Sequence, residues 1–229
     1  MAREGTGNVG SVSDALPLRL VLASASPARR KTLQAAGIEP EVLVSGVDES
    51  LVVTERAEDL CLELARLKAQ AVLTRLRPTD DQRTLVLGCD SVLAFDGEIL
   101  GKPEDAGDAT RRWERMRGRS GVLHSGHCLV DMVGGRRAEA VASTVVHFAD
   151  ISDHEIATYV GTGEPLAVAG AFTIDGLGGA FVEGIEGDPG TVIGLSLPLL
   201  RRLLADLDLQ ITDLWTKVAP GNQLIEPLG

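Results

Sequence analysis

The sequence LRLVLASASPARRKTLQAA, residues 18–36, decides how the rest of the chain is read. Residues 20–23 are a short apolar run, which predicts a buried strand. Ser26 then predicts a helix N-cap, and Pro27 predicts the first helical position, where a missing N–H has no cost. Gly37 predicts the end of this helix. The sequence therefore indicates a strand that turns directly into a helix.

The start of this helix is suited to an anion. Free backbone N–H groups and the positive end of the helix dipole meet there. Arg29 and Arg30 fall in the same first turn, where they oppose the dipole by a few tenths of a kcal/mol. A bound anion offsets this cost, and nucleotide phosphate is the obvious candidate. Solvated surface arginines explain the same stretch equally well when it is taken alone.

Composition excludes several classes of protein. The 229 residues are enough for one large domain or two small lobes, and the net charge of −11 argues against general nucleic-acid binding. No apolar run is long enough to span a membrane, and residues 1–16 lack the pattern of a secretory signal. The odd count of three cysteines predicts reduced thiols in a cytoplasmic protein.

The expected organisation is a disordered extension at residues 1–16, one domain at residues 17–206 and a tail at residues 207–229. Further strands are expected at 40–45, 84–88, 92–95, 98–100, 122–132, 137–148 and 181–185, and helices at 56–76, 105–117, 152–160 and 195–204. Residues 161–179 are rich in glycine and predict a loop that closely approaches another group.

Charged residues follow several of these elements. Asp48 and Glu49 come after the strand at 40–45, where they suit either a hard cation or a solvated turn. Asp90 follows the strand at 84–88, and ligands gather beyond the carboxyl ends of strands in open α/β sheets. Lys102 follows a hairpin that turns at Asp96-Gly97 and lies between a glycine and a proline.

Two further side chains have open interpretations. Lys68 stands at the edge of a predicted buried stripe of Leu60, Leu64, Leu67 and Ala71, where it either snorkels to water or reaches toward a site. His124 and His127 invite a metal interpretation, but residues i and i+3 of a strand point to opposite faces.

Taken together, cations and carboxylates at element ends suit metal-assisted hydrolysis of a phosphoanhydride. The cations are Arg29, Arg30, Lys68 and Lys102, and the carboxylates are Asp48, Glu49, Asp90 and Asp175. The chain has no Walker A pattern, nucleophile elbow or zinc-protease helix.

The sequence resembles the Maf family of nucleoside triphosphate pyrophosphatases, and its actinobacterial branch most closely. The matching blocks run from residue 18 to residue 204: LASASPARR at 22–30, VDE at 47–49, LARLKA at 64–69, DS at 90–91, LGKP at 100–103, GEP at 163–165, AG at 169–170, GLGG at 176–179 and VIGL at 192–195.

This resemblance implies a mixed α/β sheet flanked by helices, with two lobes around a cleft, similar to the inosine triphosphate pyrophosphatases. It implies hydrolysis of a nucleoside triphosphate to the monophosphate and pyrophosphate with Mg²⁺ or Mn²⁺. It also implies a cytoplasmic homodimer that cleans the nucleotide pool, with a link to arrest of cell division. No nucleic acid or membrane partner is expected.

The resemblance also assigns roles to residues. Asp90 matches the proton acceptor for the attacking water, and Glu49 with Asp90 is expected to hold the metal. The phosphates are expected to contact Ser24, Ser26, Arg29, Arg30, Lys68 and Lys102, and the base is expected to be selected by Ala28, Ser91 and Asp175.

This chain departs from the family pattern at three positions. Relatives that prefer dTTP and UTP carry arginine at the position of Ala28 and glutamine at that of Asp175, and the family's histidine is replaced by Gly121. An ionised aspartate only accepts hydrogen bonds, so Asp175 favours a base edge that offers N–H groups, as guanine and cytosine do. We therefore expect no strict preference for thymidine and uridine nucleotides.

Two other functions fit the same residues. A nucleotide-binding regulator of septum formation would bind nucleotide without turnover. A different metal-dependent phosphatase would release orthophosphate. Separate assays for pyrophosphate and orthophosphate distinguish all three.

Overall fold

The computed structural model describes residues 16–78 and 81–216. The predicted disordered extension therefore lies outside the described residues, except for residue 16. Residues 217–229 of the predicted tail also lie outside them. The first part of that tail is packed: Leu207 and Leu214 are buried in the same cluster as the helix that precedes them. Within the described residues, no helix is long and apolar enough to cross a membrane.

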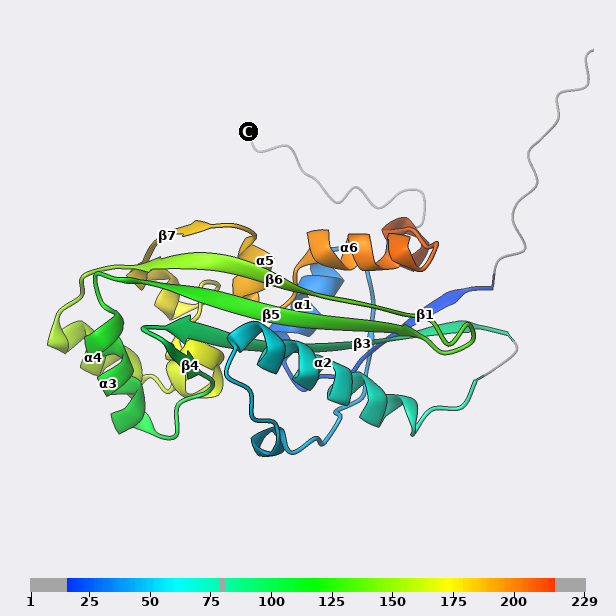
Figure 1. Cartoon of the computed structure of the whole chain (residues 1–229). Coiled ribbons are helices and arrows are strands. Elements are labelled where there is room, and N and C mark those ends of the chain that lie inside the picture. Colours follow the sequence, from blue (N-terminus) through cyan, green and yellow to red (C-terminus); the bar gives the residue numbers. More distant parts are fainter. Residues whose placement is uncertain (1–15, 79–80, 217–229) are drawn as a thin grey trace, which may run out of the picture.

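Seven strands form one mixed sheet in the order β2-β1-β3-β5-β6-β7, with β4 paired to β3 outside this path (Figure 1). The strands are β1 (Leu18–Leu22), β2 (Glu41–Val42), β3 (Arg83–Phe95), β4 (Glu98–Leu100), β5 (Ser120–Asp131), β6 (Arg137–Phe148) and β7 (Val182–Glu186). β1 runs parallel to β2 and β3, whereas the remaining pairs are antiparallel. The mixed α/β sheet expected from the sequence is confirmed.

Helices cover both faces of this sheet (Figure 1). They are α1 (Pro27–Ala35), α2 (Ala57–Leu73), α3 (Ala106–Met116), α4 (Asp153–Gly161), α5 (Pro189–Ile193) and α6 (Leu197–Asp206), with 3-10 turns η1 (Glu49–Leu51), η2 (Glu164–Ala167), η3 (Ala169–Ala171), η4 (Leu177–Phe181) and η5 (Ile211–Leu214). The short helix α5 was not expected from the sequence.

Alternation along β1 explains why the sheet is covered twice. Leu20 and Leu22 pack with α1 and α6 on one face, while Val21 and Ala23 pack with α2 on the other. Successive side chains of a strand point to opposite faces, so a continuous apolar run needs a helix layer on each side. The run at residues 20–23 therefore specifies the three-layer arrangement around β1.

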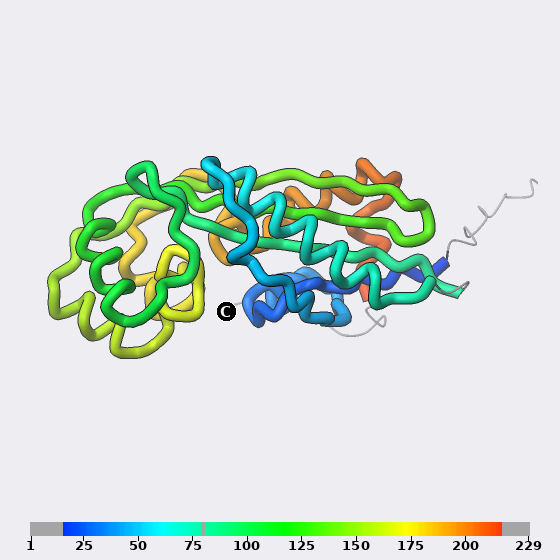
Figure 2. Tube along the Cα trace, turned by 60° about the horizontal axis from the view of Figure 1, so that its bottom comes forward, coloured from blue at the N-terminus to red at the C-terminus, as the bar shows by residue number. Residues whose placement is uncertain are grey.

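A second apolar cluster lies at the other end of the sheet. Trp113 of α3 is its centre, with Phe148, Tyr159 and Phe181 packed edge-on at 5.6–5.9 Å between ring centroids. Figure 2 shows α3 and α4 gathered at this end, away from the N-terminal part of the chain. Both clusters draw residues from β3, β5 and β6.

The edge of β3 that faces β1 is interrupted. β1 pairs with residues 83–87 of β3, and β4 pairs with residues 93–95, so residues 88–92 have no strand neighbour on this side. The expectation that Asp90 follows the end of its strand is wrong, because β3 continues to Phe95. Its antiparallel partner β5 pairs as far as Ala94, and this pairing keeps β3 extended past Asp90.

Two glycines allow α2 to lie unusually close to the sheet. A Cβ atom at Gly88 would overlap the backbone of Ala65, and one at Gly126 would overlap the backbone of Cys61. Gly126 is also the cross-strand partner of Asp90. The close approach brings the buried face of α2 directly over Asp90.

The predicted buried stripe of α2 is displaced around the helix. Leu64 is buried, but Leu60, Leu67 and Ala71 are only partly buried. The buried face instead carries Ala57, Cys61, Leu64, Ala65, Lys68, Ala69 and Val72. Small residues lie on this face because the glycines of β3 and β5 bring the backbones together, a tertiary effect that overrides the apolar periodicity.

Most local signals in the sequence are confirmed. Ser26 caps α1 by accepting from the backbone N–H of Arg29, and Ser152 with Glu155 forms a capping box on α4. Asp96 and Gly97 both have positive φ angles, as a two-residue hairpin turn requires. The strand expected at 40–45 is shorter than predicted, with only Glu41–Val42 paired.

We expect Gly126→Ala to destabilise the protein by about 1–3 kcal/mol, because the added methyl group overpacks the contact with α2. Chemical denaturation measures the free energy of unfolding. Gly161→Ala is the matched control, since a Cβ there meets nothing within 4 Å. Its effect is expected to be neutral, or a gain below about 1 kcal/mol. Equal losses in the two variants would contradict the close contact.

Candidate active site

A cavity of about 760 Å³ lies beside the interrupted edge of β3. Its walls come from the N-terminus of α1, the segment before α2, the middle of β3, the segment after β4 and the loop between α4 and β7. Of the residues expected to form the site, the lining includes Ser24, Ser26, Ala28, Arg29, Glu49, Lys68, Asp90, Ser91, Lys102 and Asp175. Residues widely separated in sequence are therefore brought together as predicted.

Lys68 is the centre of the charged wall. Its Nζ lies 2.5 Å from Asp90 Oδ1 and 2.6 Å from Glu49 Oε1. Lys68 and Asp90 are buried, with exposed fractions of 8% and 6%. The lysine does not snorkel to water, because the ion pairs compensate its burial. Asp48, by contrast, is exposed and caps η1 by accepting from Ser50.

Burial raises the pKa of Asp90 above its ordinary value, although Lys68 and Arg29 act in the opposite direction. A raised pKa means that this carboxylate accepts a proton more readily than an exposed aspartate does. Asp90 Oδ1 contacts Lys68, and the side chain also lines the cavity. The arrangement is suited to a carboxylate that orients a water molecule and takes its proton.

Arg29 fills the interrupted edge of β3. Its guanidinium donates to the carbonyl oxygens of Cys89 (2.9 Å) and Gly194 (2.9 Å), and to the hydroxyls of Ser24 (3.0 Å) and Ser91 (3.1 Å). These acceptors are neutral, and among the described residues Arg29 has no carboxylate within ion-pair distance. Arg29 thus joins three segments, and its positive charge lies beside the cavity without a direct carboxylate partner among the described residues.

The remaining expected cations differ in position. Lys102 lines the cavity and is exposed, and the carbonyl of its neighbour Gly101 accepts from Gly170 and Arg112. Arg30 is not part of the lining; it lies on the exposed side of α1, 3.5 Å from Glu39. Helical geometry explains the difference, since adjacent residues of a helix face different directions.

Residues of the loop before β7 also line the cavity. Asp175 is exposed on this loop, which also contributes Phe172 and Thr173, and Val192 and Ile193 of α5 belong to the same lining. Glu164, to which the sequence analysis gave no role, binds this loop from outside the cavity through the backbone N–H groups of Leu177 and Gly178. A glutamate within the glycine-rich stretch 161–179 was the available signal, but its partners depend on the tertiary fold.

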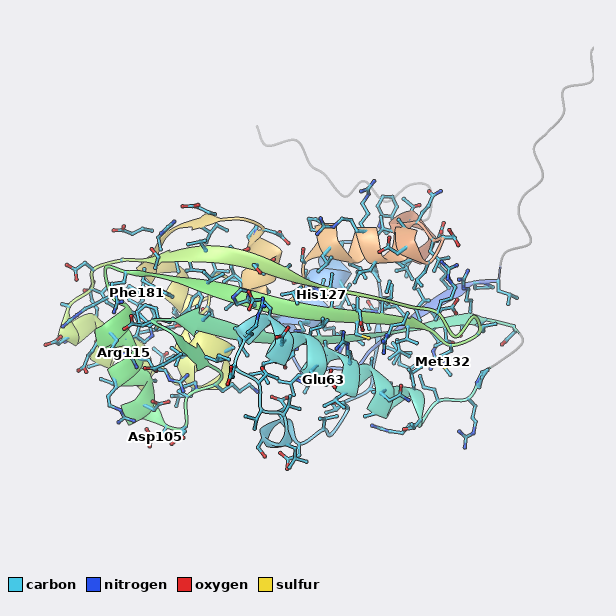
Figure 3. The ribbon with its side chains drawn as sticks, viewed as in Figure 1. Glu63, Asp105, Arg115, His127, Met132 and Phe181 are labelled. Carbon is cyan, nitrogen blue, oxygen red and sulfur yellow. The ribbon has the colours of Figure 1, made fainter. Side chains whose placement is uncertain are left out.

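Other reactive groups are occupied by structural contacts. His127 lies on β5 (Figure 3) and uses both ring nitrogens. Nδ1 donates to the carbonyl of Ser125, and Nε2 accepts from the backbone N–H of Ser196. Burial lowers the pKa of His127 to about 4. Burial also raises the pKa of Cys61, Cys89 and Cys128 to about 12, and all three thiols are free. The ring nitrogens of His127 are therefore taken up by hydrogen bonds, and the three thiols favour the protonated form, which is a weak nucleophile.

The donor set suits a divalent cation that is also held by phosphate. Glu49 and Asp90 both reach Lys68 Nζ, so the two carboxylates converge on one point. Mg²⁺ is usually bound by one or two carboxylates together with water and substrate phosphates. Among the described residues, no group of three or more histidine, cysteine, aspartate or glutamate side chains forms a closed metal site. The two carboxylates are fewer ligands than a closed metal site requires.

Comparison with known proteins agrees with this geometry. The model of the Maf-like protein family matches residues 19–207. A nucleoside triphosphate pyrophosphatase of Salinispora tropica is 82% identical over 206 residues, which are 90% of this chain and 91% of that protein. Proteins of the same name from Streptomyces coelicolor (58% identical, 86% and 94% covered) and Microcystis aeruginosa (48% identical, 87% and 100% covered) also match.

We expect Arg29→Lys to destabilise the protein by about 1–3 kcal/mol even without ligand, since one ammonium group cannot satisfy four dispersed acceptors. Thermal or chemical denaturation measures the change. Arg30→Lys is the matched control from the next position, and its exposed side chain should change the stability by less than about 0.5 kcal/mol. An equally small effect at Arg29 would contradict its role as a clamp.

Proposed function

We propose that this chain, which belongs to the Maf-like protein family, is an enzyme that hydrolyses nucleoside triphosphates to the monophosphate and pyrophosphate. The family match and the name of its relatives, nucleoside triphosphate pyrophosphatase, support this function over nucleotide binding alone. The observation that carries the proposal is the contact of Lys68 Nζ with both Glu49 and Asp90 inside the cavity. The contact holds the buried carboxylate of Asp90, which can act as a base, beside the buried ammonium group of Lys68.

The proposed reaction is attack of water on the α-phosphorus. Asp90 accepts a proton from the water as the new P–O bond forms, and the bond between the α-phosphorus and the bridging oxygen breaks. Pyrophosphate leaves with the electron pair of that bond. The positive charges of Lys68, Lys102 and Arg29 stabilise the negative charge that develops on the phosphates.

The carboxylates of Glu49 and Asp90 would hold a divalent cation, Mg²⁺ or Mn²⁺, together with the phosphates. The cation supplies charge neutralisation and polarises phosphoryl oxygens when it is bound. The contribution of the chain is to hold both carboxylates near Lys68, which keeps two negative charges close together before any ligand arrives. We therefore expect the release of pyrophosphate to depend on an added divalent cation.

We propose that Ala28, Ser91 and Asp175 contact the nucleoside side of the substrate. Asp175 lies on an exposed loop of the lining and carries an acceptor, which favours base edges that donate hydrogen bonds. The Ser91 hydroxyl accepts from Arg29 at 3.1 Å, so a residue proposed for the nucleoside contacts one proposed for the phosphates. The expected homodimer and cytoplasmic location, like the expected likeness to inosine triphosphate pyrophosphatases, stay predictions.

We expect Asp90→Asn to lower the rate of pyrophosphate release by about 10²-fold or more, because the amide cannot accept the proton. Pyrophosphate and orthophosphate are assayed separately, with and without Mg²⁺, and nucleotide binding is expected to persist. Asp96→Asn, at the hairpin turn at the end of β3, is the control and should leave the rate unchanged. Release of orthophosphate alone, or no turnover by the unmodified protein, would overturn the proposed function.

The nucleotide preference is tested by a panel of dTTP, UTP, CTP, GTP and 7-methyl-GTP. We expect the nucleotides of guanine and cytosine, whose edges offer an exocyclic amino group, to be hydrolysed with higher kcat/KM than dTTP and UTP, whose edges offer one ring N–H between two carbonyls. The difference should shrink in Asp175→Gln, because the glutamine amide both donates and accepts. A strong preference of the unmodified protein for dTTP and UTP would contradict this role of Asp175.

A further inference from the structure

Glu164 lies outside the cavity, yet its carboxylate gathers donors from the loop that lines it. Oε1 accepts from the hydroxyls of Tyr159 (3.0 Å) and Thr173 (2.5 Å) and from the backbone N–H of Gly178 (3.0 Å), while Oε2 accepts from the N–H of Leu177 (3.0 Å). A single carboxylate thus holds both ends of the segment 173–178. Hydrogen bonds to an ionised acceptor are among the stronger ones in proteins.

The segment held in this way carries part of the cavity wall. Thr173 and Asp175 line the cavity, whereas Glu164 and Tyr159 do not. Glycines make the contact possible: a Cβ at Gly176 would press on the Glu164 carboxylate, and one at Gly178 would overlap the Tyr159 hydroxyl. The loop therefore wraps around the carboxylate and presents Asp175 on its other side.

The other end of this network is fixed in the core. The Tyr159 ring packs edge-on against Trp113 at 5.6 Å and Phe181 at 5.4 Å between centroids. Its hydroxyl donates to Glu164 and accepts from the backbone N–H of Thr173 (3.3 Å). Tyr159 therefore anchors the loop to the packed aromatic cluster.

We propose that Glu164 is a positioning residue that fixes the loop 173–178, and through Asp175 the binding of the nucleobase. This inference rests on the proposed hydrolysis of nucleoside triphosphates. Glu164 touches no reacting group; it acts by setting where Asp175 and Thr173 stand. An interaction of this kind contributes to substrate binding in the ground state and the transition state alike, so its loss raises KM more than it lowers kcat.

The charge of Glu164 is maintained by its surroundings. Burial raises its pKa, but the hydrogen bonds from Thr173, Leu177, Gly178 and Tyr159 outweigh this effect and hold the pKa below the ordinary value for a glutamate. The carboxylate therefore remains ionised at neutral pH, where it can accept from all four donors.

Glu164→Gln tests the proposal, because the amide nitrogen replaces an acceptor with a donor that faces other donors. We expect KM for the nucleotide that the unmodified protein prefers to rise about tenfold or more, since small displacements of a binding group have effects of this size. The value of kcat should change by less than about threefold. The discrimination between bases should fall in parallel.

Two further variants complete the test. Tyr159→Phe removes one donor to Glu164 and leaves the carboxylate in place, so KM should shift in the same direction by a smaller factor, and this variant serves if Glu164→Gln does not fold. Glu155→Gln is the matched control: it makes the same charge change in the capping box of α4, outside the cavity lining, and should leave KM unchanged.

The outcomes separate the two proposals. An unmodified protein that hydrolyses no nucleotide refutes the proposed function. If the unmodified protein is active, an unchanged KM in folded Glu164→Gln or, where that variant does not fold, in Tyr159→Phe shows that Glu164 only stabilises the fold. A loss of kcat at constant KM likewise overturns a positioning role for the base.

Discussion

The site depends on five residues of β3, residues 88–92, that have no strand beside them on one edge. Buried main-chain polar groups need partners, and here a side chain from another element supplies one: Arg29 donates to the carbonyl of Cys89. Because no strand occupies this position, the N-terminus of α1 and the side chains of Asp90 and Ser91 share one space. An unbroken β1–β3 pair would fill that space with backbone.

The second constraint is the distance between α2 and the sheet. Gly88 and Gly126 remove the side chains that would hold the helix away, and the buried face of α2 then places Lys68 against Asp90. The contact fixes both charges before a substrate binds, and fixed charges need little rearrangement during a reaction. Arg29 adds a guanidinium whose four neutral partners orient it without cancelling its charge.

Local patterns predicted the fold well where local interactions decide it. The cap at Ser26, the capping box at Ser152 and the turn at Asp96-Gly97 all depend on neighbouring residues. The gathering of distant site residues followed from the family resemblance and not from periodicity. Tertiary contacts decide the rest. β3 continues past Asp90 because it pairs with β5, and Lys68, whose direction the sequence left open, is buried because glycines lie opposite α2. Adjacent helix residues face different directions, and only the placement of α1 against the sheet decides that Arg29 faces the cavity and Arg30 does not.

The long strands have a mechanical consequence. Leu85 and Leu129 belong to the apolar cluster at one side of the cavity, and Leu93 and Leu123, farther along the same β3 and β5, belong to the cluster at the other side. Both clusters are therefore anchored to the same two continuous strands, and this shared support opposes a hinge motion between them. Because Glu164 holds the loop 173–178, we expect access for a bulky ligand to come from movement of the peripheral segment 43–56 or from changes in the twist of the sheet.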